Sequence, residues 1–127
     1  MTHLGESLED YLESILVLSK QLPIVRSVDV ASYLGYSKPS VSHAVKLMHE
    51  QDLITLDKNK SLHLTEKGAA IANETWRRHQ FFTHMLMEIG VDKQTAQEDA
   101  CRMEHVVSQK TFDAIRDYFE AKEAGQK

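Results

Sequence analysis

The sequence lacks a second cysteine, a long hydrophobic run and an excess of basic residues. Its single cysteine excludes a disulfide within the chain and is typical of a reducing compartment. The apolar run from Ile15 to Leu18 is far shorter than the ~18 residues that cross a bilayer. The first residues do not place a basic segment before an apolar one, so no secretion signal is expected. We therefore expect a cytoplasmic protein without a membrane segment.

Charge is unevenly distributed along the 127 residues, whose formal net charge is −4. Residues 1–25 carry −3 and residues 68–127 carry −2, whereas residues 26–67 carry +1. Because nucleic acid attracts basic surfaces, any DNA contact is expected in the middle third. The composition, with 42% hydrophobic and 27% charged residues, is that of a globular chain with one compact domain or a small domain plus a helical element.

The segment between residues 27 and 50 predicts a helix-turn-helix, and an amphipathic helix is predicted before it, over residues 7–19. Ser27 is the expected N-cap of a short helix that Gly35 ends. Ser37 is the expected N-cap of the next helix. The residues of this second helix that are expected to face the core are Val41, Val45 and Met48.

The segment after the helix-turn-helix predicts a β-hairpin. Residues 53–56 and 61–64 are β-prone, and the polar turn between them contains two lysines. A helix-turn-helix followed by a basic-tipped hairpin is the winged-helix arrangement.

Three further helices are predicted after the hairpin. Thr65 is the expected N-cap of the first and Asp92 of the second. Ser108 or Thr111 begins the last helix, whose tail from Glu120 is expected to fray. The predicted fold is therefore mainly α with a small β-hairpin wing. We expect a winged helix-turn-helix domain over residues 1–66 and a helical domain over residues 67–127.

The second helix of a helix-turn-helix enters the major groove, with its N-terminal residues nearest the bases. Hydroxyl and imidazole groups there can contact bases, and lysines of the helix and the wing suit phosphates. The predicted DNA contacts are Ser37, Lys38, Pro39, Ser40, Ser42, His43, Lys46, Lys58 and Lys60. One chain carries one recognition helix, so we expect a homodimer on a pseudo-palindromic, double-stranded operator. The apolar residues available for a dimer surface or a core are Phe81, Phe82, Met85, Leu86, Ile89, Phe112, Ile115 and Phe119.

A candidate metal site lies in the second of the later helices. Cys101, Glu104 and His105 are three and four residues apart, so a helix presents them on one face. A thiolate, a carboxylate and an imidazole together form a transition-metal ligand set. The other helices offer as further donors Asp10, Glu13 and His79. Spacing does not show that these donors converge. Taken singly, Cys101 would be a small buried hydrophobe, Glu104 and His105 would be solvated, and His79 would be a hydrogen-bonded core histidine.

Several motifs resemble the iron- and manganese-dependent repressors, a family that comprises the diphtheria toxin repressor and the manganese transport regulator. The motifs are LEDYLE at residues 8–13, RRH at residues 77–79 and DACRMEHVVS at residues 99–108. The resemblance covers nearly the whole chain. It implies a winged-helix domain joined to a helical metal-binding and dimerisation domain, and a repressor of metal-uptake genes. It also implies that Fe²⁺ or Mn²⁺ bridges the two domains and activates DNA binding.

The resemblance also implies which residues bind metal. Five ligands of the manganese-type site are matched by Asp10, Glu13, His79, Glu104 and His105. Cys101 stands where manganese-type members have Glu and iron-type members have Cys. The iron-type ancillary site uses a Glu where this chain has Thr83 and a His near Gln97, so that site is not reproduced. A thiolate favours Fe²⁺ over Mn²⁺, which makes Fe²⁺ the preferred cofactor and Mn²⁺ the close alternative. The SH3-like third domain of the longer iron-type members is expected to be absent.

Two other functions fit parts of the pattern. A winged-helix regulator could sense a small organic ligand in its helical domain, and then changes at Cys101 and Glu104 would not alter DNA binding. A metalloenzyme could use the same donors with an open coordination position. The sequence has no HExxH motif, nucleophile elbow or phosphate-binding glycine loop, so we do not expect an enzyme.

Overall fold

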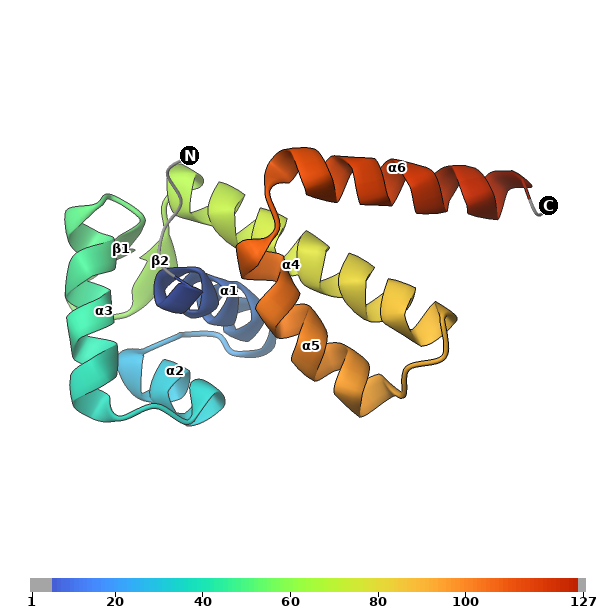
Figure 1. Cartoon of the computed structure of the whole chain (residues 1–127). Coiled ribbons are helices and arrows are strands. Elements are labelled where there is room, and N and C mark those ends of the chain that lie inside the picture. The colour runs from blue at the N-terminus through green and yellow to red at the C-terminus, as the bar shows by residue number, and fades with distance from the viewer. Residues whose placement is uncertain (1–5, 126–127) are drawn as a thin grey trace. The chain divides into compact units, whose positions relative to one another are not determined.

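The computed structural model describes residues 6–125, which form six helices and a two-stranded hairpin (Figure 1). The elements are α1 (Glu6–Gln21), α2 (Ser27–Leu34), α3 (Lys38–Glu50), β1 (Ile54–Leu56), β2 (Leu62–Leu64), α4 (Glu66–Glu88), α5 (Lys93–Val106) and α6 (Gln109–Gly125). The expected mainly α fold with a β-hairpin wing is confirmed. The chain divides into two compact units, the first ending at Thr75 and the second beginning at Trp76. The functional division at residues 66 and 67 stays a prediction.

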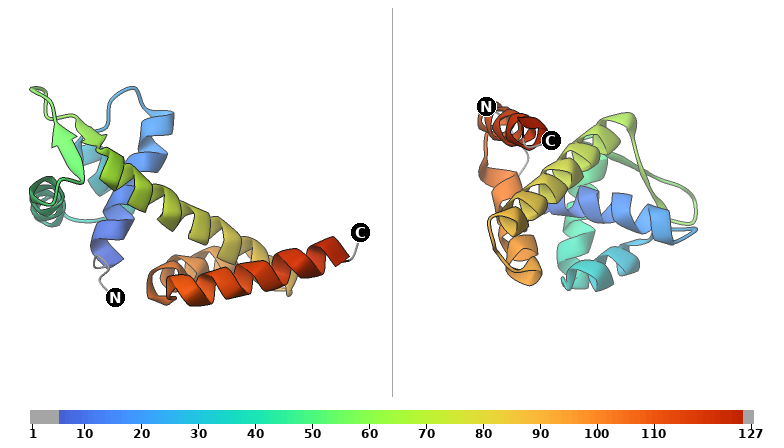
Figure 2. Two further views of the ribbon diagram at one scale, coloured as in Figure 1. Left: turned by 90° about the horizontal axis from the view of Figure 1, so that it is seen from above. Right: turned by 90° about the vertical axis from the view of Figure 1, so that its right-hand side faces the viewer.

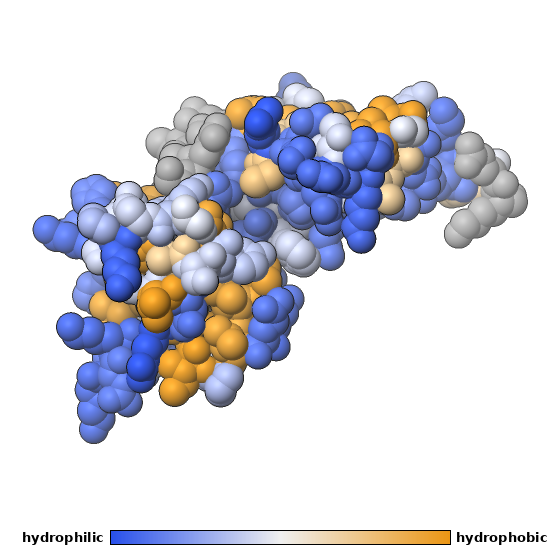
Figure 3. Space-filling view, turned by 90° about the horizontal axis from the view of Figure 1, so that it is seen from below, coloured by the Kyte–Doolittle hydropathy of each residue, from blue (hydrophilic) through white to orange (hydrophobic). Residues whose placement is uncertain are grey.

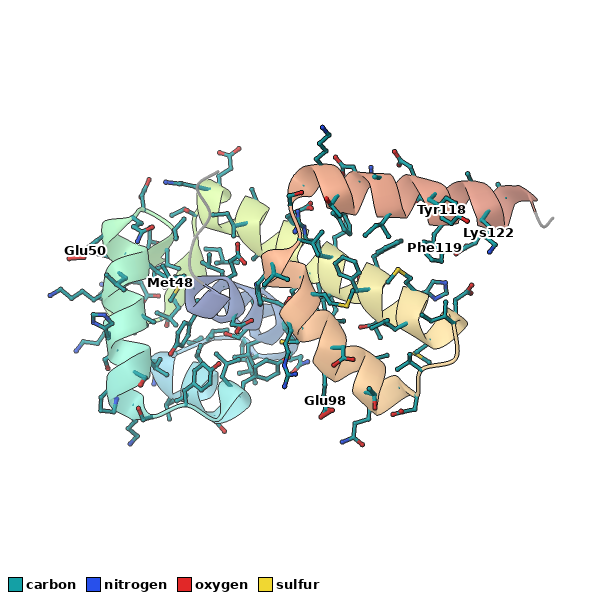
Figure 4. All side chains as sticks on the ribbon, viewed as in Figure 1. Met48, Glu50, Glu98, Tyr118, Phe119 and Lys122 are labelled. Atoms are coloured by element: carbon teal, nitrogen blue, oxygen red, sulfur yellow. The ribbon has the colours of Figure 1, made fainter. Side chains whose placement is uncertain are left out.

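The first unit is built around the helix-turn-helix of α2 and α3. Gly35 ends α2 with a φ of 73°, a left-handed conformation that glycine adopts without a steric penalty. Ser37 caps α3, because its Oγ accepts a hydrogen bond from the backbone N–H of Ser40. Met48 lies on the inner side of α3 and is fully buried, whereas Glu50 points outward (Figure 4). The turn chemistry predicted between these helices is thus confirmed.

The prediction that Ser27 caps α2 was wrong by one residue. Ser27 is the first residue of the helix, and its N-cap is Arg26. The reason is Asp29, whose carboxylate accepts a hydrogen bond of 2.9 Å from the backbone N–H of Arg26. A carboxylate that reaches back to the N-cap stabilises the helix start as a serine cap would.

The wing is an antiparallel hairpin in which Ile54 pairs with Leu64 and Leu56 with Leu62. Asp57 holds its turn: Oδ1 accepts hydrogen bonds from the backbone N–H groups of Asn59 and Ser61, at 2.9 and 3.0 Å. The backbone hydrogen bond from Ser61 is the largest cause of a lowered pKa at Asp57. The turn therefore has an ordered conformation that depends on one carboxylate.

The second unit contains the rest of α4, with α5 and α6. Figures 1 and 2 show α5 running back along α4 and α6 returning in the opposite direction. Its core contains the fully buried Phe82, Ala100 and Phe112. Phe81 contacts two α6 rings edge to face, Phe112 at 5.5 Å and Phe119 at 6.4 Å between ring centroids. Phe119 points from α6 towards α4 in Figure 4. Aromatic packing thus fixes α6 to α4.

Two predictions concern the last helix: where it begins, at Ser108 or Thr111, and whether its tail from Glu120 frays. Ser108 is the cap of α6, since its Oγ accepts a hydrogen bond of 3.1 Å from the backbone N–H of Thr111. The tail from Glu120 does not fray, because α6 continues to Gly125. Residues 121–124 are alanine, lysine and glutamate, which are strong helix formers.

Within residues 6–125, no helix is both long and apolar enough to cross a membrane. On the face drawn in Figure 3, hydrophilic residues predominate and hydrophobic residues gather in limited areas.

Candidate functional site

The first unit exposes every side chain that the sequence predicts to contact DNA. All nine predicted residues are exposed: seven lie on α3 or at its N-cap, and two lie at the tip of the wing. The opposite side of α3 carries the buried Val41, Ala44 and Met48. The core therefore fixes α3 from one side and leaves its polar side free, as a recognition helix requires.

Two details shape this surface. The Ser37 hydroxyl donates to the Ser40 hydroxyl at 2.9 Å, so the cap orders both side chains at the start of α3. Lys60 has a φ of 60°, which turns the chain sharply at the wing tip. Lys58 and Lys60 consequently lie on an exposed, ordered turn, where they can reach phosphates.

Four of the predicted metal ligands lie in the second unit. One of them, Glu104, contacts two of the others, His79 and His105. Glu104 Oε2 lies 2.9 Å from His79 Nδ1, and Glu104 Oε1 lies 3.4 Å from His105 Nε2. The Glu104 side chain is fully buried and that of His105 is 2% exposed. Glu104 and His105 are therefore not the solvated residues that their types alone would suggest.

Cys101 lies one turn before Glu104 on α5. One ligand atom each of Cys101, Glu104 and His105 lies within 4.8 Å of the others. The helical face predicted from their spacing is therefore present. Cys101 is exposed. We call Cys101, Glu104 and His105 the α5 donor face. The Cys101 thiol is its accessible member.

His79 is oriented by its own helix. Its ring stacks on that of Trp76, with 5.7 Å between centroids and 15° between planes. The bond from Nδ1 to Glu104 fixes the ring from the other side. A histidine held at both its ring face and its Nδ1 has little rotational freedom, so the orientation of the His79 ring is set before any ligand binds.

Arg78 is a residue of this region that the sequence reasoning missed. Its Nη1 donates to the backbone carbonyl oxygens of Glu104, at 3.2 Å, and Val107, at 2.5 Å. Its guanidinium lies 4.9 Å from the centroid of the Phe112 ring. Arg78 therefore holds the C-terminal turn of α5, which carries Glu104 and His105. Its position directly before His79 in the RRH motif was the available signal.

The remaining predicted ligands, Asp10 and Glu13, lie in the first unit. They are three residues apart on α1 and both are half-buried. Because side chains three apart share a helix face, the two carboxylates lie on one side of α1. Both stay predicted ligands.

The iron-type ancillary site was expected to be missing, because this chain has Thr83 in place of its acidic ligand and Gln97 near the position of its histidine ligand. Thr83 has a buried hydroxyl with no hydrogen-bond partner among the described residues, and Gln97 is exposed. Neither side chain supplies a carboxylate or an imidazole. The donors of the second unit that lie within 4.8 Å of one another, a thiol, a carboxylate and an imidazole, fit a divalent transition metal such as Fe²⁺, Co²⁺ or Zn²⁺, and a second imidazole, that of His79, contacts the carboxylate.

Comparison with family models matches both units. Residues 3–62 match the model described as "Iron dependent repressor, N-terminal DNA binding domain". Residues 65–123 match "Iron dependent repressor, metal binding and dimerisation domain". The second match includes all four ligands predicted in the second unit.

Curated relatives are similar over most of the chain. "Transcriptional regulator MntR" of Escherichia coli O6:H1 is 37% identical over 114 residues, which cover 90% of this chain and 74% of that protein. "HTH-type transcriptional regulator MntR" of Bacillus subtilis strain 168 is 32% identical and covers 95% of this chain and 87% of that protein. The "Diphtheria toxin repressor" of Corynebacterium jeikeium is 34% identical, over 84% of this chain and 45% of that protein.

Among solved structures, the manganese regulator SloR has a TM-score of 0.81 and 29% identity. The match covers 89% of this chain and 53% of that one, so this chain spans about half the length of that structure. These relatives are transcriptional regulators by name. None is named as an enzyme or as a sensor of an organic ligand, so both alternative functions lack support from them.

Proposed function

Because the chain belongs to the iron-dependent repressor family of metal-dependent, DNA-binding transcriptional regulators, we propose that it represses metal-uptake genes when Fe²⁺ or Mn²⁺ is abundant. The family consists of regulators, which are not enzymes. Such a repressor acts on DNA, and its place of action would be the cytoplasm.

The observation that supports this proposal most strongly is the arrangement around Glu104. A buried carboxylate lies between the imidazoles of His79 and His105, and Cys101 lies on the same face of α5. Burying an ionised carboxylate is costly unless a partner or a metal compensates it. We propose these residues as metal ligands, with Asp10 and Glu13 as the further ligands that the sequence predicts.

The bound metal would supply positive charge and a fixed coordination geometry. The protein residues have defined tasks in this scheme. Glu104 would exchange its contacts with the two imidazoles for metal coordination, and Cys101 would lose its thiol proton, because thiolate is the form that binds metal. Trp76 and Arg78 would keep His79 and the end of α5 in place.

The donor set favours Fe²⁺, with Mn²⁺ as the close alternative. A soft thiolate is a poor ligand for Mn²⁺, which prefers carboxylate and carbonyl oxygen. The names of several relatives refer instead to manganese. The identity of the side chain at position 101 is therefore the feature on which our preference for Fe²⁺ depends.

We propose that the active form is a homodimer that binds a pseudo-palindromic operator through α3 and the wing. Metal bound by ligands from both units would set the separation of the two recognition helices. Metal and DNA binding would then be linked by a coupling free energy, which is typically ~1–3 kcal/mol.

The test is DNA binding as a function of metal. A duplex selected for binding from random sequence in the presence of metal is titrated with protein, using anaerobic Fe²⁺, Mn²⁺ or a chelator, and fluorescence anisotropy is measured. We expect the chelator to weaken binding by ~5- to 150-fold, the range that corresponds to that coupling. Equal affinity in all three conditions would exclude metal control. Metal dependence that survives in the variant Glu104→Gln/His105→Gln would instead exclude the proposed ligands.

A further inference from the structure

A second group of potential metal ligands lies in the second unit, on the last turn of α4 and near the end of α6. His84 and Glu88 are four residues apart on α4, and Glu123 comes from α6. His84 Nε2 lies 3.3 Å from Glu88 Oε1 and 3.7 Å from Glu123 Oε1. One ligand atom from each of the three residues lies within 4.8 Å of the others.

These separations suit a small cation. Two donors bound tetrahedrally to Zn²⁺ at 2.0–2.1 Å lie ~3.3 Å apart, so the three side chains need only small movements to share one ion. All three are about half exposed or more, with exposed fractions of 62%, 48% and 48%. Water can therefore complete the coordination.

The charges around this cluster also favour a cation. Among residues 8–125, no lysine or arginine forms an ion pair with Glu88 or Glu123, so the two carboxylates share one imidazole. Glu88 is the last residue of α4, and Glu123 lies two residues before the end of α6. The C-terminal end of a helix carries partial negative charge, which attracts cations.

The cluster is separate from the proposed ligand His79. His84 follows His79 by five residues on α4, which corresponds to ~7.5 Å along the helix axis. At ~100° per residue the two side chains also point in directions ~140° apart. One ion cannot be bound by both histidines in this geometry.

We propose that His84, Glu88 and Glu123 form a second, independent site for a divalent transition-metal ion, with Zn²⁺ bound more tightly than Mn²⁺. An imidazole with two carboxylates is a ligand set that accepts both ions, and Zn²⁺ stands above Mn²⁺ in the general order of affinity. The ion would connect the ends of α4 and α6, close to the contact of Phe81 with Phe119. It would thereby fix the last turns of α6.

The proposal is tested by measuring how many zinc ions each protein variant binds. Zinc chloride is titrated into the wild type, His84→Gln and the double variant Glu88→Gln/Glu123→Gln, and the number of bound ions and their dissociation constants are measured by calorimetry. We expect each variant to bind one ion fewer, or to bind that ion at least tenfold more weakly. Mn²⁺ titrated into the wild type should fill this site at higher concentration than Zn²⁺.

The chain offers a matched control. His63 is also exposed and also contacts a carboxylate, Asp57, at 3.2 Å, but it has only this one acidic partner. The variant His63→Gln should keep the wild-type zinc stoichiometry. An equal loss in His63→Gln would show that any exposed histidine binds zinc, and it would overturn the proposal.

Two further measurements test the proposed His84 site. The variant Glu104→Gln/His105→Gln should keep the His84 site, which separates this proposal from the function proposed above. Unchanged zinc stoichiometry and affinity in both His84→Gln and the double variant would refute the second site. Circular dichroism of each variant checks the fold, and because all three side chains are exposed, we expect the wild-type spectrum.

Discussion

At the scale of single residues, Cys101 decides the chemistry of the proposed metal site. The neighbouring proposed ligands Glu104 and His105 are buried, whereas Cys101 is exposed on the same helix face. A change at this position alters the donor atom without disturbing the core. If Cys101 binds metal as proposed, this is the position at which metal preference would change separately from folding.

Cys101→Glu should shift metal preference towards Mn²⁺, because it replaces a soft sulfur donor with a carboxylate. We expect the ratio of the Fe²⁺ and Mn²⁺ concentrations that half-activate DNA binding to change at least tenfold. Fluorescence anisotropy with a selected duplex measures both concentrations. Arg102→Lys, a change at the exposed neighbouring residue, is the control and should leave the ratio unchanged. An unaltered ratio in Cys101→Glu would show that residue 101 is not a ligand.

Arg78→Met should destabilise the second unit and weaken metal binding. It removes the hydrogen bonds to the carbonyl oxygens of Glu104 and Val107. Hydrogen bonds from charged groups contribute ~1.5–3 kcal/mol, and loss of a residue behind the metal ligands typically costs ~10–100-fold in metal affinity. Urea unfolding and metal titration measure the two effects. Arg78→Lys should recover only part of either, because lysine lacks the planar fork.

The control is Arg102→Met, since Arg102 is an exposed arginine on α5. Its effect should stay within ~0.5 kcal/mol. Wild-type metal affinity in Arg78→Met, measured where the protein is folded, would contradict a positioning role for this arginine.

At the scale of elements, the first turn of α4 packs directly on the residue before β1. A Cβ at Gly68 would lie 2.0 Å from the carbonyl oxygen of Leu53, which is a backbone atom and cannot rotate away. This contact fixes the start of the long helix against the wing. Glycine is required here for close approach and not for an unusual φ.

Gly68→Ala should therefore destabilise the first unit by ~1–3 kcal/mol, the usual cost of overpacking. Thermal and urea unfolding measure it. Gly125→Ala is the matched control, because a Cβ there meets nothing within 4 Å. If both variants unfold at the wild-type denaturant concentration, α4 and the chain at Leu53 are not tightly packed in solution.

The wing should weaken in acid because of Asp57. Its pKa is lowered first by the backbone hydrogen bond from Ser61, then by the hydrogen bond with His63. A carboxylate with a lowered pKa stabilises the fold above its unfolded pKa, and this contribution disappears as the pH falls through the folded pKa. The stability difference between wild type and Asp57→Asn should thus be constant above about pH 5 and shrink below about pH 4. Urea unfolding at several pH values measures it, and a difference independent of pH would show that the charge of Asp57 contributes nothing.

At the scale of the whole molecule, the proposed function links two binding events that belong to different units. Residues of α3 and the wing would contact DNA, whereas most of the proposed ligands lie on α4 and α5. Linkage requires that each event change the affinity of the other by the same factor. This reciprocity distinguishes metal control from a metal that merely stabilises the fold.

Saturating DNA should accordingly lower the dissociation constant for Fe²⁺ or Mn²⁺ by the factor by which metal strengthens DNA binding, ~5- to 150-fold. Metal titrations with and without the selected duplex measure the factor. The variant His84→Gln is expected to show the same coupling as the wild type, because its proposed ion is separate. Metal affinity that does not respond to DNA would contradict the linkage.

The sequence by itself determined the order of the elements and most of their ends. Caps such as Ser37 and Asp92 act on N–H groups three residues away, so their signals are local. The common face of Cys101, Glu104 and His105 also follows from helical spacing alone. The one misplaced cap, Ser27, failed because a competing local signal, Asp29, was stronger.

Only the tertiary structure decided which distant donors meet. His79 and Glu104 are 25 residues apart, Arg78 and Val107 are 29 apart, and the residues between them give no spacing signal. The same holds for His84 and Glu123, whose contact also lies in the tail that was expected to fray. Helical periodicity reports which side of a helix a residue occupies. Which other helix faces that side depends on packing of the aromatic core formed by Phe81, Phe82 and Phe112.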